Sequence, residues 1–151
     1  MRKIILTKRL FSEIDDEDFE RVSKYNWSFD GNGYAFRIEK GKIIKLHRFI
    51  MNCPKGMEVD HIDGDGLDNR KSNLRICSHI KNTYNQKNRL NVNNTSGFKG
   101  VHKVRKKYRA YISYNHKRIN LGYFKSAKEA AIAYNKAAIK FHKSFARINN
   151  F

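Results

Sequence analysis

The segment from Asn88 to Ser96, NRLNVNNTS, separates two parts of the chain that differ sharply in charge. It is rich in asparagine and is followed by Gly97, a composition that favours turns and exposed chain. Residues 1–90 carry 18 basic and 13 acidic residues, whereas residues 91–151 carry 14 basic residues and a single acid, Glu129. For a chain of 151 residues, this break predicts two small domains, 1–90 and 97–151, joined by a linker at 91–96.

The formal net charge of +18 indicates a polyanionic partner. A solvated or ribosomal-type basic surface is the alternative, but nucleic acid is favoured because like charge packed this densely costs stability unless a partner neutralises it. No apolar run long enough for a membrane span is present, so no membrane partner is expected, and no obligatory protein partner is evident. Cys53 and Cys77 lie outside any CxxC pair, which disfavours a disulfide framework or zinc knuckle and fits a reducing cytosol.

The basic part has the pattern of a small sheet covered by one helix. Gly100–Val104 predicts a first strand, KYRAYISY a second and KRINLGYF a third, with a turn at Asn115-His116. Ser126-x-x-Glu129 is a capping box that opens a helix ending near His142. The residues expected on the apolar side of the second and third strands are Tyr108, Ala110, Ile112, Tyr114, Ile119, Leu121 and Tyr123. The helix is expected to face them with Ala127, Ala130, Ala131, Tyr134, Ala138 and Phe141.

The most polar region is the stretch from Val59 to Asn85, which holds two histidines, four aspartates and four asparagines. It predicts strands at Val59–Ile62 and Leu74–Cys77, a turn between them, and a helix from about His79 to Lys87 capped by Ser78. A calcium-binding loop is excluded. Counting from Asp63 places Leu67 and Asp68 where that loop requires an oxygen ligand and a glycine.

Further elements are expected ahead of this stretch. The pattern predicts a strand at Lys3–Thr7, a helix from about Asp15 to Lys24, and a hairpin of strands at Tyr34–Ile38 and Lys42–Leu46. His47–Met51 then continues as a short helix or as the end of a strand. The fold class expected for the whole chain is α+β.

Asp60-His61, Asn73 twelve residues after His61, and Asn82 nine residues after Asn73 resemble the motif of HNH nucleases. The flanking segments LHRFI and NRKSNLR support the resemblance, which covers about residues 43–88. The last position is asparagine rather than histidine, as in homing-type members of the family. The resemblance implies a ββα-metal core at about 56–88 that hydrolyses phosphodiester bonds.

The resemblance also implies the role of each motif residue. Asp60 and Asn82 would be the metal ligands, and their hard oxygens suit Mg²⁺ or Mn²⁺. His61 would be the general base that takes a proton from the attacking water, and Asn73 would brace the loop and orient His61.

Other polar residues near the motif are open to more than one interpretation. Arg70, Lys71 and Arg75 are expected to meet DNA phosphates, with solvated charge as the alternative for each. His79 could be a phosphate contact, a polar surface residue or, least favoured, a ligand. His47 is expected to be a packed or hydrogen-bonded histidine behind the site.

The segments SGFKGVHK, YRAYI, LGYF and AAIAYN resemble the plant APETALA/ethylene-response-factor DNA-binding domain over about residues 95–148. The resemblance implies a three-stranded antiparallel sheet, packed on one helix, that enters the major groove of double-stranded DNA. A nonspecific phosphate contact is the alternative for most of the implied DNA-contacting residues, which are His102, Lys103, Arg105, Arg109, Tyr111 and Arg118.

Taken together, the charge pattern and the two resemblances imply a metal-dependent DNA endonuclease of the free-standing homing type. It would nick duplex DNA gripped by the basic domain, in a bacterial or phage-infected host cytosol. A non-catalytic, sequence-specific DNA-binding regulator is the main alternative. An RNA-binding accessory protein is less favoured, because the sheet lacks the adjacent stacking aromatics of RNA-recognition modules.

Overall fold

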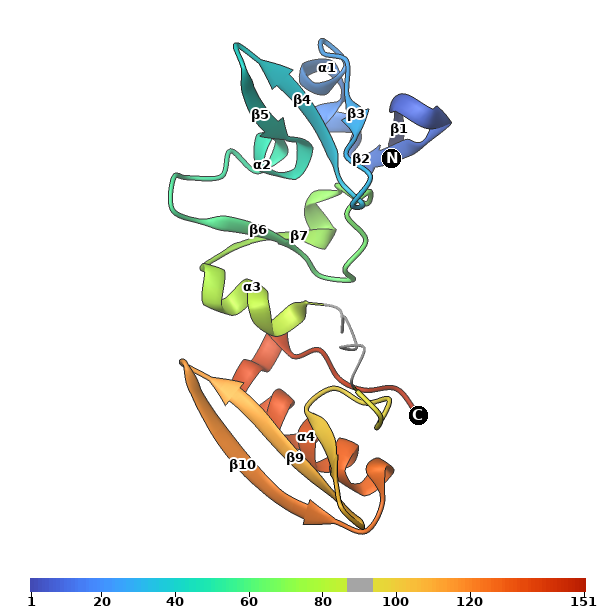
Figure 1. The fold of residues 1–151 in the computed structure, drawn as a ribbon. Coiled ribbons are helices and arrows are strands. Elements are labelled where there is room, and N and C mark those ends of the chain that lie inside the picture. The colour runs from blue at the N-terminus through green and yellow to red at the C-terminus, as the bar shows by residue number, and fades with distance from the viewer. Residues whose placement is uncertain (87–93) are drawn as a thin grey trace. The chain divides into compact units, whose positions relative to one another are not determined.

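The computed structural model describes residues 1–86 and 94–151 and divides the chain into two compact units, 1–82 and 83–151 (Figure 1). Residues 91–93 of the predicted linker, and Lys87 at the predicted end of a helix, lie outside the described residues. In the described ranges, no helix is long and apolar enough to cross a bilayer. Cys53 and Cys77 are both free thiols.

Unit 1, which is described throughout, is built from short antiparallel strands around one apolar core. Strand β1 (Arg2–Ile5) pairs with β2 (Phe11–Ile14), and β4 (Ala35–Glu39) lies between β3 (Ser28–Phe29) and β5 (Lys42–Lys45). Helix α2 (Leu46–Ile50) follows β5 directly, so the helical alternative for this segment is the correct one. The core consists of the buried side chains of Ile4, Leu6, Ile14, Val22, Trp27, Ala35, Leu46, Ile50, Val59 and Leu74.

The N-terminal segment differs from its sequence prediction. The strand expected at Lys3–Thr7 runs from Arg2 to Ile5. The helix expected from Asp15 to Lys24 is a 3-10 turn at Asp16–Asp18 followed by the four-residue helix α1 (Phe19–Val22). Strand β2 was not predicted, because FSEI acquires its strand conformation from pairing with β1 rather than from a local pattern.

The polar stretch forms a hairpin followed by a helix. Strand β6 (Glu58–His61) pairs with β7 (Leu74–Cys77), which places Asp60 opposite Arg75 and His61 opposite Leu74. Helix α3 (His79–Asn85) follows, and the Ser78 hydroxyl accepts a long hydrogen bond of 3.5 Å from the Lys81 amide, as expected of a cap. The order is therefore strand, strand, helix, and the loop between the strands carries residues 62–73.

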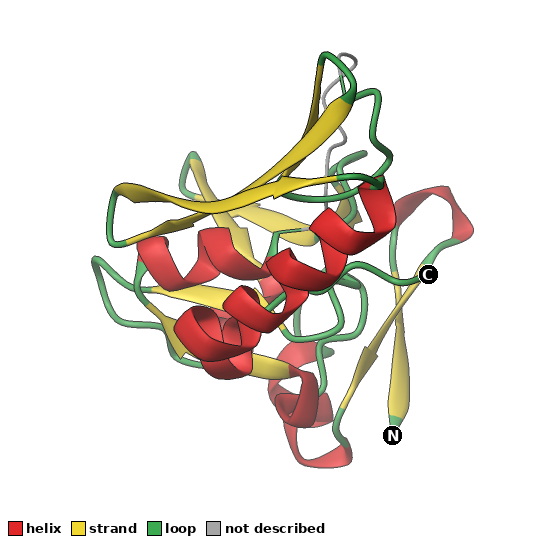
Figure 2. Ribbon diagram, turned by 90° about the horizontal axis from the view of Figure 1, so that it is seen from below, coloured by secondary structure: helices red, strands yellow, loops and turns green. Residues whose placement is uncertain are grey.

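Unit 2 contains a three-stranded antiparallel sheet in the order β10-β9-β8, with helix α4 (Ala127–His142) along one face (Figure 2). The strands are β8 (Val101–Val104), β9 (Lys107–Tyr114) and β10 (Lys117–Phe124), as the alternation of side chains predicts. The helix begins where the capping box places it, because the Ser126 hydroxyl accepts a hydrogen bond from the Glu129 amide at 3.2 Å.

Small residues allow α4 to lie close to the sheet. Ala110, Ala130, Ala131 and Ala138 are fully buried between them. Gly100 is at φ +70°, and a Cβ atom there would lie 2.6 Å from the carbonyl oxygen of Tyr111 and overlap the Tyr134 ring.

Strand β10 corrects one expectation. Its pairing with β9 shifts between Asn120 and Gly122, and such a bulge reverses the side-chain alternation after that point. Tyr123, predicted on the apolar face, is therefore exposed, and Phe124 packs against the core instead.

Candidate active site

The two faces of strand β6 carry a predicted metal ligand, Asp60, and the predicted general base, His61. Asp60 and His61 are adjacent, so their side chains leave opposite faces of the strand. Both are buried, with 6% and 5% of their surface exposed. On the Asp60 side, Arg75 donates to one carboxylate oxygen from Nε at 2.8 Å and from Nη2 at 2.6 Å. The ion pair fixes the orientation of the Asp60 carboxylate.

Glu58 connects helix α3 to the Asp60 face of the hairpin. The Asn82 amide nitrogen donates to one Glu58 oxygen at 2.6 Å, and His79 Nδ1 lies 2.7 Å from the other. Hydrogen bonds from Asn82 first, and then from His79, hold the pKa of the Glu58 carboxyl below its usual range. Glu58 precedes Asp60 by two residues and points the same way, about 7 Å along the strand. Asn82 is thus brought to the side of the strand where Asp60 lies.

The side-chain chemistry of Asp60 and Asn82 suits a divalent cation. Asp60 would supply its carboxylate, and Asn82, whose amide nitrogen donates to Glu58, would supply its carbonyl oxygen as the second donor. Two hard oxygen ligands suit Mg²⁺ or Mn²⁺, which retain several waters in protein sites. Among the residues that the structure describes, no group of three or more histidine, cysteine or acidic side chains is arranged to hold a metal. A site at Asp60 would therefore depend on the amide of Asn82 and on water.

His61 lies on the opposite face among aromatic rings. Its ring centroid is 5.0 Å from that of His47 and 5.8 Å from that of Tyr34. Burial lowers the pKa of His61, against opposing effects of a hydrogen bond with Asn69 and the charge of Asp63. The imidazole is consequently neutral near pH 7, which is the state in which it can accept a proton.

Asn73 ties the loop between the two strands together. Its side-chain oxygen accepts from the Asp63 amide at 3.1 Å, and its amide nitrogen donates to the Asp63 carboxylate and the Asp68 carbonyl, both at 2.9 Å. Its carbonyl accepts from the Ile62 amide at 2.9 Å, next to His61. These are contacts of the kind expected for a residue that braces the loop.

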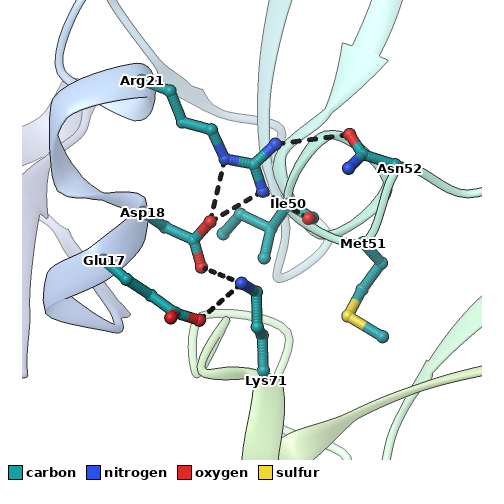
Figure 3. A pocket seen from close by; sticks show the side chains of 7 residues that line it. All are labelled: Glu17, Asp18, Arg21, Ile50, Met51, Asn52 and Lys71. Carbon is teal, nitrogen blue, oxygen red and sulfur yellow. Dashed lines mark hydrogen bonds and ion pairs between the residues drawn. The ribbon is translucent and has the colours of Figure 1, made fainter.

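The three basic residues predicted to meet phosphates near the motif are paired with carboxylates. Arg70 contacts Asp68 at 2.5 Å, and Arg75 contacts Asp60 as described above. Lys71 lies 2.5 Å from Glu17 and 3.3 Å from Asp18, at the edge of a pocket of about 480 Å³ (Figure 3). A contact of these cations with DNA stays a prediction, and it would compete with these ion pairs.

The open face of the sheet in unit 2 carries four of the six residues predicted to contact DNA, which are His102, Arg109, Tyr111 and Arg118. His102 stacks on Tyr111 with ring centroids 5.1 Å apart, and Arg118 lies over the same tyrosine ring at 4.3 Å. Arg109 lies opposite His102 in the strand pairing, and Arg105 lies in the turn between β8 and β9. Lys103 is separated from them, because it neighbours His102 along β8 and points to the opposite face.

Comparison with known proteins identifies the family. A model of the HNH endonuclease family matches residues 52–84. Over 149 residues the chain is 31% identical to an uncharacterized HNH endonuclease, L560, of Acanthamoeba polyphaga mimivirus, an alignment that covers 94% of this chain and 76% of the viral protein. The chain belongs to the HNH endonuclease family. It is therefore a hydrolase that cleaves DNA.

A shorter stretch of the endonuclease is similar to a phage protein. Over 48 residues, or 32% of this chain, it is 44% identical to Protein 3.8 of Escherichia phage T7, of which the alignment covers 38%. No solved structure matches the endonuclease.

Three residues around the motif of the endonuclease were missed by the sequence analysis: Ser12, Glu58 and Asn69. Asn69 is fully buried, and its side-chain oxygen lies 3.2 Å from His61 Nε2. It opens the NRKSNLR segment, but spacing alone gives it no partner. Glu58 precedes the motif, and no sequence pattern singles it out. Ser12 lies 57 residues before its partner Asn69, a separation that local patterns cannot bridge.

The burial of His47 is expected to make the stability of the endonuclease depend on pH. Its Nδ1 is buried without a hydrogen-bond partner among the described residues, and burial first, then the charge of His61, lowers its pKa to about 3. Below the ordinary pKa of 6.5 the unfolded chain binds a proton that the folded chain does not. The free energy of unfolding should therefore decrease as pH falls from about 6.5 toward 3, by up to about 1.4 kcal/mol per pH unit.

Urea denaturation of wild type and His47→Leu between pH 7 and pH 4 tests this prediction. The variant should show a shallower dependence of unfolding free energy on pH. His116→Asn, an exposed residue at positive φ where asparagine is tolerated, serves as the control and should behave as wild type. Parallel curves for wild type and His47→Leu would contradict the prediction.

Proposed function

We propose that this endonuclease is metal-dependent and nicks one strand of duplex DNA held by the basic unit 2, in the manner of homing-type members of the family. The proposal is carried by the arrangement around strand β6. Asp60 and the Asn82 side chain lie toward one face of the strand, and a neutral imidazole lies on the other. Such an arrangement would supply one ligand and a base at neighbouring positions of β6, with the second ligand coming from helix α3.

Asp60 and Asn82 would hold Mg²⁺ or Mn²⁺. When bound, the ion would neutralise charge on the scissile phosphate and on the departing oxygen. His61 would accept the proton of the attacking water, because burial lowers its pKa and so favours the neutral imidazole near pH 7. Arg75, already 2.6 Å from Asp60, would stabilise the negative charge gathered at this face. Asn73 would keep the loop after His61 in place through its contacts with Asp63 and Asp68.

Unit 2 would supply most of the DNA affinity. Residues 91–151 carry 14 basic residues against one acid, and helix α4 covers only one side of the sheet. The open side carries the stacked His102, Tyr111 and Arg118, together with Arg109. A similarity to the APETALA/ethylene-response-factor domain agrees with a sheet that enters the major groove. Phosphate contacts made by this face would be sequence-independent, whereas contacts with base edges would select a site.

A nicking product is expected because one chain carries one motif. Supercoiled plasmid incubated with the endonuclease and Mg²⁺ or Mn²⁺ should convert to open circles before linear molecules accumulate, and an excess of chelator should stop the conversion. Cleavage that continues in the chelator would refute metal dependence. Linear product formed without an open-circle intermediate would refute nicking.

A further inference from the structure

A buried hydrogen-bond chain joins the N-terminal hairpin to the imidazole of His61. Ser12 on strand β2 and Asn69 in the loop after β6 are both fully buried, and His61 is 5% exposed. The Asn69 amide nitrogen lies 2.7 Å from the Ser12 hydroxyl, and its side-chain oxygen lies 3.2 Å from His61 Nε2. Ser12 lies outside residues 52–84, which the family model matches.

The direction of each hydrogen bond follows from groups that can only accept. The Ser12 hydroxyl lies 2.9 Å from the carbonyl of Leu67, so it must donate its single hydrogen there and accept from Asn69. The Asn69 nitrogen also lies 3.2 Å from the carbonyl of Gly66, which again accepts only. Both contacts require the amide nitrogen of Asn69 to face away from His61. Its oxygen, which carries no hydrogen, therefore faces His61 Nε2.

A consequence follows for the imidazole. The contact between the Asn69 oxygen and His61 Nε2 is a hydrogen bond only if Nε2 carries the hydrogen. In a neutral imidazole with its hydrogen on Nε2, the nitrogen that can accept a further proton is Nδ1. The alternative tautomer would place two acceptors against each other in a buried site, which is unfavourable because neither could form a hydrogen bond there.

The backbone holds the chain of hydrogen bonds in register. The Glu13 amide donates to the Leu67 carbonyl at 2.9 Å, and the Asn69 amide donates to the Glu13 carbonyl at 2.8 Å. Asp15 accepts from the Lys71 amide at 2.7 Å. The segment that follows Phe11 is thus fastened to the loop on both sides of Asn69.

We propose that Ser12 and Asn69 are positioning residues that lock His61 in the Nε2–H tautomer and so make Nδ1 the atom that accepts the proton of the attacking water. The catalytic use of Nδ1 rests on the proposed function, whereas the tautomer does not. The N-terminal hairpin is accordingly part of the active-site machinery and acts through Asn69.

Nitrogen-15 NMR of the histidine-labelled, metal-free chain of 151 residues at a pH where His61 is neutral tests the tautomer directly. His61 is assigned by the signal that disappears in His61→Gln. Wild type should show a protonated Nε2 and an unprotonated Nδ1. Asn69→Ala should show a mixture of tautomers, and Ser12→Ala, the milder change, should shift in the same direction. Thr7→Ala is the matched control. It removes another hydroxyl of the same segment, one that accepts from the Phe29 amide, and should leave the His61 signals unchanged.

Nicking should fall by roughly tenfold or more in Asn69→Ala, and by less in Ser12→Ala, with DNA affinity unchanged. A wild-type His61 protonated at Nδ1, or signals unmoved in both variants, would overturn the inference. Those outcomes would leave the proposed function intact. Full activity of His61→Ala would instead remove the catalytic role and leave the tautomer assignment standing.

Discussion

Replacing His61 with alanine is expected to slow DNA cleavage by a factor of about 10² to 10⁴, the range for loss of a general base. The other groups around β6 should remain, because Asp60 is held by Arg75, and Asn82 by Glu58, on the other face of the strand. DNA affinity should therefore match that of wild type. The measurement pairs the rate of plasmid nicking in Mg²⁺ with a binding isotherm under the same conditions.

This experiment needs a control for the stability of the His61→Ala protein. His61 is buried against His47 and Tyr34, so alanine leaves a cavity that lowers stability. Thermal unfolding must show a folded variant at the assay temperature, and the His47→Leu protein reports how far a change behind the site alone affects the rate. A folded His61→Ala protein that nicks at the wild-type rate would rule out His61 as the base.

The second large effect is expected from three arginines of unit 2, of which Arg109 and Arg118 lie on the open face of the sheet and Arg105 lies in the turn between β8 and β9. Arg105, Arg109 and Arg118 changed together to glutamine should weaken DNA binding and make it less sensitive to salt. If each arginine neutralises one phosphate, the slope of log affinity against log salt should fall by about 3. Binding isotherms at several salt concentrations measure both quantities.

A matched variant distinguishes the effect of these three arginines on DNA affinity from the effect of the total charge of the unit. Lys128, Lys136 and Lys140 are exposed on α4, and changing them to glutamine removes the same charge from the other side of the unit. The helix variant should lose much less affinity than the sheet variant. Equal losses would mean that DNA responds to the total charge rather than to the face that carries Tyr111.

Local patterns predicted the elements whose side chains repeat with a clear period. The strands of unit 2 and the capped start of α4 lie where alternation and the Ser126 box place them. Strand β2 could not be predicted, because its strand conformation depends on pairing with β1 in the folded chain and not on its local sequence. The prediction that Tyr123 lies on the apolar face was wrong for a related reason, since the bulge in β10 depends on pairing with β9.

The candidate site shows the same division. A period of two places Asp60 and His61 on opposite faces of β6, and the order of strand, strand and helix follows from local signals. The sequence does not show that Arg75 pairs with Asp60 or that Glu58 binds the Asn82 amide. Those contacts join residues from different elements, so only the packed chain determines them.

Binding of Mn²⁺ to the DNA-free protein tests the central claim most directly, because it asks whether Asp60 and Asn82 form one site without requiring cleavage. Titration followed by the electron paramagnetic resonance of free Mn²⁺ should show one site per chain in wild type and in His61→Ala. Affinity should fall by at least about tenfold in Asp60→Ala and in Asn82→Ala, each of which removes one oxygen ligand. Binding of equal strength in all four proteins would contradict the account.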